Sequence, residues 1–389
     1  MTTGTFPIRL IATLTTAVLL SALANAQPAS NPFPTLEALG EALFHDANLS
    51  LQRTQSCATC HAAGAAFIDI RTQGIGGAVS VGDDGQALGI RNTPTLMYAL
   101  YAPPFHAIAP GVYRGGQFHD GRARSLPNQV NLNGGPFLNP DEMMMPSRAA
   151  VIARVRENPE YVSALQRFFG PQIFAREQQA FSRLGHAIAA FERTQAFHPF
   201  SAHYDAVMAE KATFTALEQA GFDLFHSPEA GCLRCHDSTA VTGLTRQTFT
   251  NYRYYNLGVP IHTAVRDARQ DDSPDPGLAA NQFLSSPAAA QLGRFKVPTL
   301  RNVAVTAPYF HNGIAHDLAT VLKLHSHRGA PDNVLHTLNP ETGLAWGTTD
   351  YPENVDYVAL AMPQPLSDPE IDALIAFLHT LTDAAFVRP

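Results

Sequence analysis

The sequence has few charged residues, no basic run and only one tryptophan. Lys and Arg number 26 and Asp and Glu 33 among 389 residues, which gives a net charge of −7 at pH 7. An acidic chain without a basic cluster argues against a nucleic-acid partner. Hydrophobic residues make up 45%, which is enough for a folded core and argues against disorder. The length predicts two or three domains.

Long apolar runs are scarce as well. The candidate run covers residues 10–23, which is shorter than the roughly 20 apolar residues that a membrane-spanning helix needs. It follows Arg9, the one charge before residue 27, and precedes Ala-Asn-Ala at 24–26. This pattern predicts a secretory signal peptide over residues 1–26 and a mature chain in the periplasm, without stable membrane insertion.

Cysteine is also rare, and all four cysteines fall in two C-x-x-C-H segments, whose residues are Cys57, Cys60 and His61, and Cys232, Cys235 and His236. Two disulfides would suit an exported protein, but neither a disulfide nor a redox dithiol needs the histidine. A zinc site would require the two distant pairs to meet. C-x-x-C-H is the attachment pattern of c-type haem. Both sulfurs can reach the haem vinyl groups from one helical turn, and the adjacent histidine is then the proximal iron ligand.

The two haem motifs belong to an internal repeat. Segments 40–45 and 221–226 each begin with Gly and end in Leu-Phe-His shortly before a motif. Each half also closes with a helical pattern, and the second pattern opens with a capping box at 367–370. The repeat predicts a mainly α fold of two cytochrome c-like haem domains, over residues 27–200 and 201–389.

Two long stretches, 66–142 and 243–300, lack strong periodicity. They are rich in Gly, Pro, Asn and Asp, which are the residues typical of turns and loops. We therefore expect long irregular loops that cover the haems, with few strands.

The sixth iron ligand decides whether a haem transfers electrons or activates a ligand. Residues 62–96 contain neither His nor Met, so no close candidate follows the first motif. Gln129 and Glu142 lie further along, and a carboxylate over an open iron suits proton transfer to bound peroxide. The plainer interpretation of Glu142 is a solvated loop acid. The methionines at 143–145 could supply a thioether ligand or pack in the core.

The second haem has a helical candidate ligand. Leu318, Val321 and His325 recur on one face of the segment 317–325. The spacing places His325 on the buried stripe of this helix and favours it as axial ligand. Met362 and His311 are the alternatives.

Longer runs in the sequence resemble the bacterial di-haem cytochrome c peroxidases, and most closely the MauG branch of that family. These runs are spread over most of the mature chain and cover residues 55–61, 78–86, 91–96, 115–123, 139–143, 249–252, 256–258, 293–304, 308–313, 339–343 and 346–347.

The resemblance implies roles at the first haem. His61 matches a proximal ligand, as His236 does at the second haem. Glu142 matches the distal acid-base residue, with Gln129 beside it and Pro136 at the distal wall. This overrides the plainer interpretation of Glu142.

The resemblance also implies ligands elsewhere. His325 matches the sixth ligand of the second haem. A calcium ion lies between the haems in this family, and its ligands match the side chain of Asn92 and the backbone carbonyls of Thr306 and Pro308. Oxygen ligands suit that hard cation.

Three positions depart from the family pattern. His325 stands where the peroxidases have Met and MauG has Tyr. His119 stands where an aromatic residue, usually Trp, lies between the haems, and Ala230 replaces a Trp of MauG. These changes disfavour the formation of a tryptophan-derived cofactor in a partner enzyme. Residues 62–105 contain no His, so we expect an open first haem in the all-ferric state.

The function implied by the resemblance is reduction of hydrogen peroxide at an open N-terminal haem. Electrons from a small c-type cytochrome or a cupredoxin would pass through a six-coordinate C-terminal haem and past His119. One alternative is a MauG-like oxidase that modifies a partner protein. The other is a non-enzymatic electron carrier, in which His119 or His106 closes the first iron.

Overall fold

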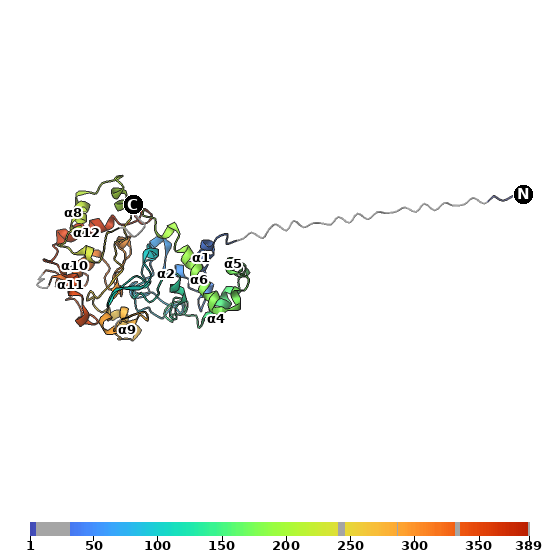
Figure 1. Ribbon diagram of the computed structural model, residues 1–389, viewed down its shortest axis with the longest axis horizontal. Helices are drawn as coiled ribbons and strands as arrows, with labels where there is room; N and C mark the ends of the chain where they lie inside the picture. Colours follow the sequence, from blue (N-terminus) through green and yellow to red (C-terminus); the bar gives the residue numbers. More distant parts are fainter. Residues whose placement is uncertain (5–31, 240–245, 286, 331–334, 388–389) are drawn as a thin grey trace. The chain divides into compact units, whose positions relative to one another are not determined.

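Helices supply most of the regular structure in the computed structural model, which describes residues 1–4, 32–239, 246–285, 287–330 and 335–387 (Figure 1). The helices in these ranges are α1 Leu36–His45, α2 Cys57–Cys60, α3 Asn128–Asn131, α4 Arg148–Arg156, α5 Pro159–Phe169, α6 Glu177–Phe191, α7 His203–Met208, α8 Ala216–His226, α9 Thr263–Arg269, α10 Leu318–Gly329, α11 Tyr357–Leu360 and α12 Asp368–His379. The mainly α class is therefore confirmed. Apart from residues 1–4, the predicted signal peptide lies outside the described residues.

The same helix pair recurs in each half of the sequence. α1 packs against α6, and α8 packs against α12. A Cβ atom on Gly40 would overlap the backbone carbonyl of Ala187, and one on Gly221 would overlap that of Ala373. The glycine that opens each repeated segment is thus needed because the two helix backbones touch there.

Side-chain caps fix where two helices of the second half begin, α8 and α12. The predicted capping box on α12 is confirmed, since the Ser367 amide donates to Glu370 Oε2 over 2.7 Å. Thr215 and Glu218 form a second capping box on α8. Each cap satisfies backbone donors that the first helical turn leaves free.

The two larger hydrophobic cores of the described residues lie within the unit Phe33–Pro389. One core contains buried residues between Leu39 and Phe197, and the other contains buried residues between Tyr204 and Leu381. In Figure 1, α1, α4, α5 and α6 gather on one side of this unit, and α8, α10, α11 and α12 gather on the other. The domain boundary between residues 200 and 201 stays a prediction. It falls between the last buried residue of the first core and the first buried residue of the second.

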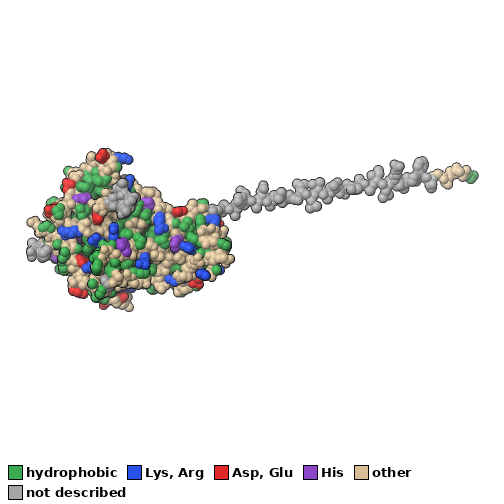
Figure 2. All heavy atoms as spheres, viewed as in Figure 1, with side chains coloured by type: hydrophobic (Ala, Val, Ile, Leu, Met, Phe, Trp, Pro, Cys, Tyr) green, Lys and Arg blue, Asp and Glu red, His purple; other side chains and the backbone are tan. Residues whose placement is uncertain are grey.

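The two long stretches without periodicity are largely irregular, as expected. They contain two small antiparallel sheets, one of β1 (His106–Ala109) with β2 (Val112–Arg114) and one of β3 (Tyr254–Tyr255) with β4 (Phe295–Lys296). The visible face of the molecule mixes hydrophobic, charged and polar side chains (Figure 2). Among the described residues, no helix combines the length and apolarity that crossing a membrane requires.

Gly221→Ala should destabilise the protein by about 1–3 kcal/mol, because the added methyl group forces α8 away from the α12 backbone. Gly64→Ala is the control, since nothing lies within 4 Å of a Cβ at that position. Urea unfolding of the two variants measures the difference. Equal free energies of unfolding for both variants would contradict the close approach of the helices.

Candidate active site and haem-binding residues

Both Cys-x-x-Cys-His segments form a tight helical turn. The first is α2, Cys57–Cys60, and the second contains a 3₁₀ turn at Cys232–Arg234. In each, the amide of the histidine donates to the carbonyl of the first cysteine, over 2.9 Å for His61 and 2.8 Å for His236. The two turns therefore have equivalent backbone hydrogen bonds, and each presents its two cysteines and its histidine in the same order.

Backbone carbonyls hold both histidines by Nδ1. His61 Nδ1 lies 2.9 Å from the Phe67 carbonyl, and His236 Nδ1 lies 3.1 Å from that of Phe249. Burial lowers the pKa of both rings, that of His236 to about 4. A neutral ring that donates through Nδ1 keeps a lone pair on Nε2, which is the state that binds iron.

The four cysteines are unpaired thiols in two separate places. Burial raises the pKa of Cys60 and Cys232 to about 12 and that of Cys235 to about 11. Cys57 packs in the first core and Cys232 in the second. Within the described ranges, no three His, Cys, Asp or Glu side chains are grouped to hold a metal ion. The arrangement fits two thioether-linked haems and not a shared zinc site.

A cavity of about 80 Å³ borders His61 and is partly open to solvent. Its walls mix apolar side chains with a few polar ones, and its lining residues are Phe44, Gln55, Ser56, Cys57, Cys60, His61, Leu96, Phe118, Gln129, Val130, Pro136, Glu142, Met143, Ile188 and Glu192. Apolar walls beside both cysteines and the histidine fit a haem. The structure thus brings Gln129, Pro136 and Glu142 to the first haem motif.

One carboxylate oxygen of Glu142 accepts a hydrogen bond, and the other accepts none from the described residues. Asn139 Nδ2 donates to Glu142 Oε1 over 2.5 Å, and no described donor contacts Oε2. The loop is pinned because the Asp83 amide donates to the Glu142 carbonyl over 2.8 Å. Burial raises the pKa of Glu142 above its usual range. An enclosed carboxyl with one free oxygen is suited to moving a proton.

A second acid in the cavity, Glu192, was missed by the sequence analysis. Only 4% of this residue is exposed, and Gln129 Nε2 donates to its Oε2 over 2.5 Å. Burial raises the pKa of Glu192 to about 8. A signal was present: Glu192 lies four residues after Ile188 and eight after Leu184, so it continues the buried stripe of α6.

The alternative ligands for the first iron lie elsewhere. His106 is exposed in β1. His119 does not line the cavity, and its Nε2 lies 3.0 Å from the Asn92 carbonyl. Met143 lines the cavity, and both it and Met145 pack in the first core. In the part of the chain that the structure describes, His61 is the one histidine at the cavity.

His325 lies close to His236. A charge on His325 lowers the pKa of His236. His325 Nδ1 lies 2.8 Å from the Val321 carbonyl, which leaves Nε2 free as in the proximal histidines. Of the two alternatives, the His311 ring stacks on Phe295 with centroids 3.6 Å apart, and Met362 packs in the second core.

Hydrogen bonds connect the residues predicted between the haems. The backbone carbonyl of Asn92 contacts His119. The backbone N–H of Asn92 donates to the His311 carbonyl over 2.7 Å. Among the described residues, no donor contacts Asn92 Oδ1 or the carbonyls of Thr306 and Pro308. Burial and the charge of Arg91 lower the pKa of His119 to about 4, so this ring is neutral.

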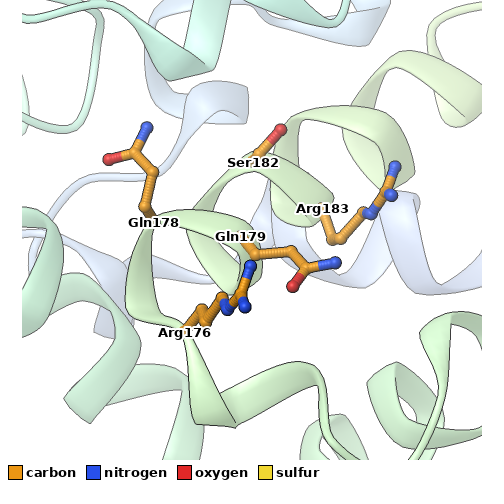
Figure 3. Close-up of a pocket in the computed structure, with 5 residues that line it drawn as sticks. All are labelled: Arg176, Gln178, Gln179, Ser182 and Arg183. Atoms are coloured by element: carbon orange, nitrogen blue, oxygen red, sulfur yellow. The ribbon is translucent and has the colours of Figure 1, made fainter.

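A shallow pocket of about 440 Å³ lies at the exposed N-terminal end of α6 (Figure 3). Its five lining residues follow one another along this helix and are Arg176, Gln178, Gln179, Ser182 and Arg183. In Figure 3 their side chains fan out from the helix and do not converge on a common point. We assign no function to this surface.

A helical chain with two such motifs, each beside its own core, defines a di-haem c-type cytochrome. A family model described as di-haem cytochrome c peroxidase matches residues 34–213. The methylamine utilization protein MauG of Paracoccus denitrificans is 44% identical over 381 residues, which cover 97% of this chain and 96% of that protein. The cytochrome c peroxidase Ccp of Escherichia coli is 32% identical over 301 residues, or 77% of this chain and 55% of that protein.

Solved structures agree with these matches. The diheme peroxidase BthA from Burkholderia thailandensis superposes with a TM-score of 0.77 at 31% identity, covering 91% of this chain and 87% of that one. The chain therefore belongs to the family of di-haem cytochrome c peroxidases and MauG proteins, and it is a di-haem oxidoreductase.

Replacing Cys57 and Cys60 together by Ser should leave one covalently attached haem per chain, because the second motif is complete and lies in a different core. Replacing Cys232 and Cys235 by Ser should likewise leave one haem, attached at the first motif. Replacing all four cysteines should leave none. Intact-mass measurement on the purified proteins counts the haems. A zinc-containing chain of unmodified mass would overturn the assignment.

Proposed function

We propose that this protein reduces hydrogen peroxide to water at the N-terminal haem site, with electrons that pass through the C-terminal one. The observation that carries the proposal is the cavity shared by His61 and Glu142. It combines a neutral histidine ready to bind iron with an enclosed carboxyl that has a free oxygen, and neither His106 nor His119 closes it.

The bound haems would supply the iron that holds peroxide and the redox centres that store and pass electrons. Peroxide takes up two electrons and two protons and gives two water molecules. Glu142 Oε2 accepts the proton of one peroxide oxygen and returns it to the other, which leaves as water. Asn139 keeps the carboxyl oriented throughout, because it holds Oε1.

At the second site, His236 and His325 would be the two axial ligands. Their Nδ1 atoms are held by carbonyls, so both offer Nε2. A site closed on both sides suits electron transfer and not peroxide binding. We place His119 on the route between the sites as a neutral group that is fixed by the Asn92 carbonyl and is not an iron ligand.

We also propose a calcium ion between the haem sites, held by the side chain of Asn92 and the carbonyls of Thr306 and Pro308. The support is that these oxygen atoms accept no hydrogen bond from the described residues. The bond from the Asn92 amide to the His311 carbonyl also places Asn92 beside the loop that carries the other two ligands. Neutral oxygen ligands of this kind suit calcium.

The electron donor we propose is a small c-type cytochrome or a cupredoxin, and the compartment is the periplasm. The proposed periplasmic location rests on the signal-like sequence of residues 1–26. Attached c-type haem agrees with export.

A second candidate is the peroxide-dependent oxidation of a partner protein, as in the MauG branch. The observation that favours it is the 44% identity to a MauG over nearly the whole chain. Against it stand His119, His325 and the buried Ala230, because the resemblance to the MauG branch implies aromatic side chains at these three positions.

Glu142→Gln should lower the rate of peroxide reduction by about 10²–10⁴-fold, because the amide keeps the shape of the side chain but cannot accept the proton. Stopped-flow turnover with a reduced small cytochrome measures the loss. Glu160→Gln, an exposed change on α5, is the control. Unchanged turnover in Glu142→Gln would exclude this residue as the acid-base group.

Low-temperature electron paramagnetic resonance of the ferric protein should show one high-spin and one low-spin haem. His325→Ala should abolish the low-spin signal, because it removes one of two axial ligands. The matched control is His327→Ala, since the His327 ring stacks on Trp346 and should leave the signal intact. Two low-spin haems in the unaltered protein would mean that the first iron is closed at rest.

A further inference from the structure

Gln129 and Glu192 form a polar pair on the wall of the cavity beside His61. Gln129 lies on α3, and Glu192 directly follows α6. Both residues line the cavity together with Glu142. The 2.5 Å bond from Gln129 Nε2 to Glu192 Oε2 joins the two elements.

The side-chain amide of Gln129 has two ends with opposite hydrogen-bonding roles. Nε2 donates and Oε1 accepts. Glu192 occupies the Nε2 end, and no donor among the described residues contacts Oε1. In this arrangement, Oε1 is the end that remains for a ligand in the cavity.

We propose that the charge state of Glu192 sets which end of the Gln129 amide is offered to a ligand in the cavity. An ionised carboxylate can only accept, so it binds Nε2 and leaves Oε1 for the ligand. A protonated carboxyl can donate its hydroxyl to Oε1, and the amide then presents Nε2 to the ligand. The inference rests on the proposed function in one respect, since it takes peroxide to be the natural ligand of the cavity.

Both charge states are accessible in ordinary solution. Burial raises the pKa of Glu192 to about 8, against a smaller opposing effect of Gln129 and Arg193. Below that pH the protonated form dominates, and the amide offers peroxide a donor. Above it the ionised form dominates, and the amide offers an acceptor. Gln129 is thus a positioning partner whose direction Glu192 controls.

The groups around Glu192 contribute little competing charge. α6 packs against α1, α3, α4 and the 3₁₀ turn Ile173–Ala175, and of these α3 and the turn carry no charged residue. The titratable or charged groups from the surrounding elements are Arg193 next in the chain, Cys57 of α2, His61 and Glu142 at the cavity, Glu37, Glu41 and His45 of α1, and Arg148, Arg154 and Arg156 of α4. The α4 guanidinium groups bond to other partners, and those partners are Gln178, Asn131, Asn133, Leu51 and Phe174.

Fluoride binding to the ferric protein tests the inference without turnover. Bound fluoride accepts hydrogen bonds, so its affinity reports which end of Gln129 faces it. From neutral to alkaline solution, the wild-type protein should lose about tenfold more fluoride affinity than Glu192→Gln loses. The glutamine at position 192 stays neutral and can donate to Gln129 at every pH, so it removes the switch. The Glu160→Gln protein should behave as the wild type does.

The Gln129→Ala background separates positioning from charge alone. In that background, Glu192→Gln should change nothing in the pH dependence of fluoride affinity. If it still removes the alkaline loss, Glu192 acts by its charge on fluoride directly, and the inference is wrong. A wild-type protein whose infrared spectrum shows no carboxyl titrating near the expected pH would also overturn it. If the wild-type protein failed to turn over peroxide but gave the expected fluoride results, the proposed function would be wrong and the switch would stand.

Discussion

The arrangement of both haem sites depends on one interaction, the hydrogen bond from a histidine Nδ1 to a backbone carbonyl. It occurs at His61, His236 and His325, with three different carbonyls as acceptors. Each bond fixes the tautomer and the plane of the ring, and burial keeps the ring neutral. The carbonyls belong to loops or to the preceding helical turn, so the position of each Nε2 is set by the course of the backbone.

The two similar halves differ in the residues that complete each site. The helix pairs and the haem turns repeat, down to the glycine that lets the backbones touch. In the second half, α10 brings His325 close to His236. In the first half, a loop brings Glu142 into the cavity, and two further polar side chains, Gln129 and Glu192, line the same wall. The repeated scaffold therefore holds the Cys-x-x-Cys-His turns, while segments outside the repeat supply the other residues at each site.

The sequence was informative where short-range geometry governs the structure. The α12 capping box and the helix containing His325 follow from residue spacing, and both are present. The bond between Asn139 and Glu142, the strand pairs and the role of Glu192 could not be derived in this way. Strand pairing joins residues far apart in the chain. The hydrogen bond between Gln129 and Glu192 depends on the packing of α3 against α6, which joins residues 63 positions apart in the chain.

The close contact between helices also constrains how the protein is assembled. The partners that touch at Gly40 and Ala187, and again at Gly221 and Ala373, lie well over a hundred residues apart in the chain. Closing such a long loop is entropically costly, and it cannot begin until the second helix of the pair has been made. Each Cys-x-x-Cys-His turn comes after the first helix of its pair and long before the second, so it stays uncovered during that interval. Covalent attachment to the thiols therefore has a natural time window, which ends when the second helix of each pair docks.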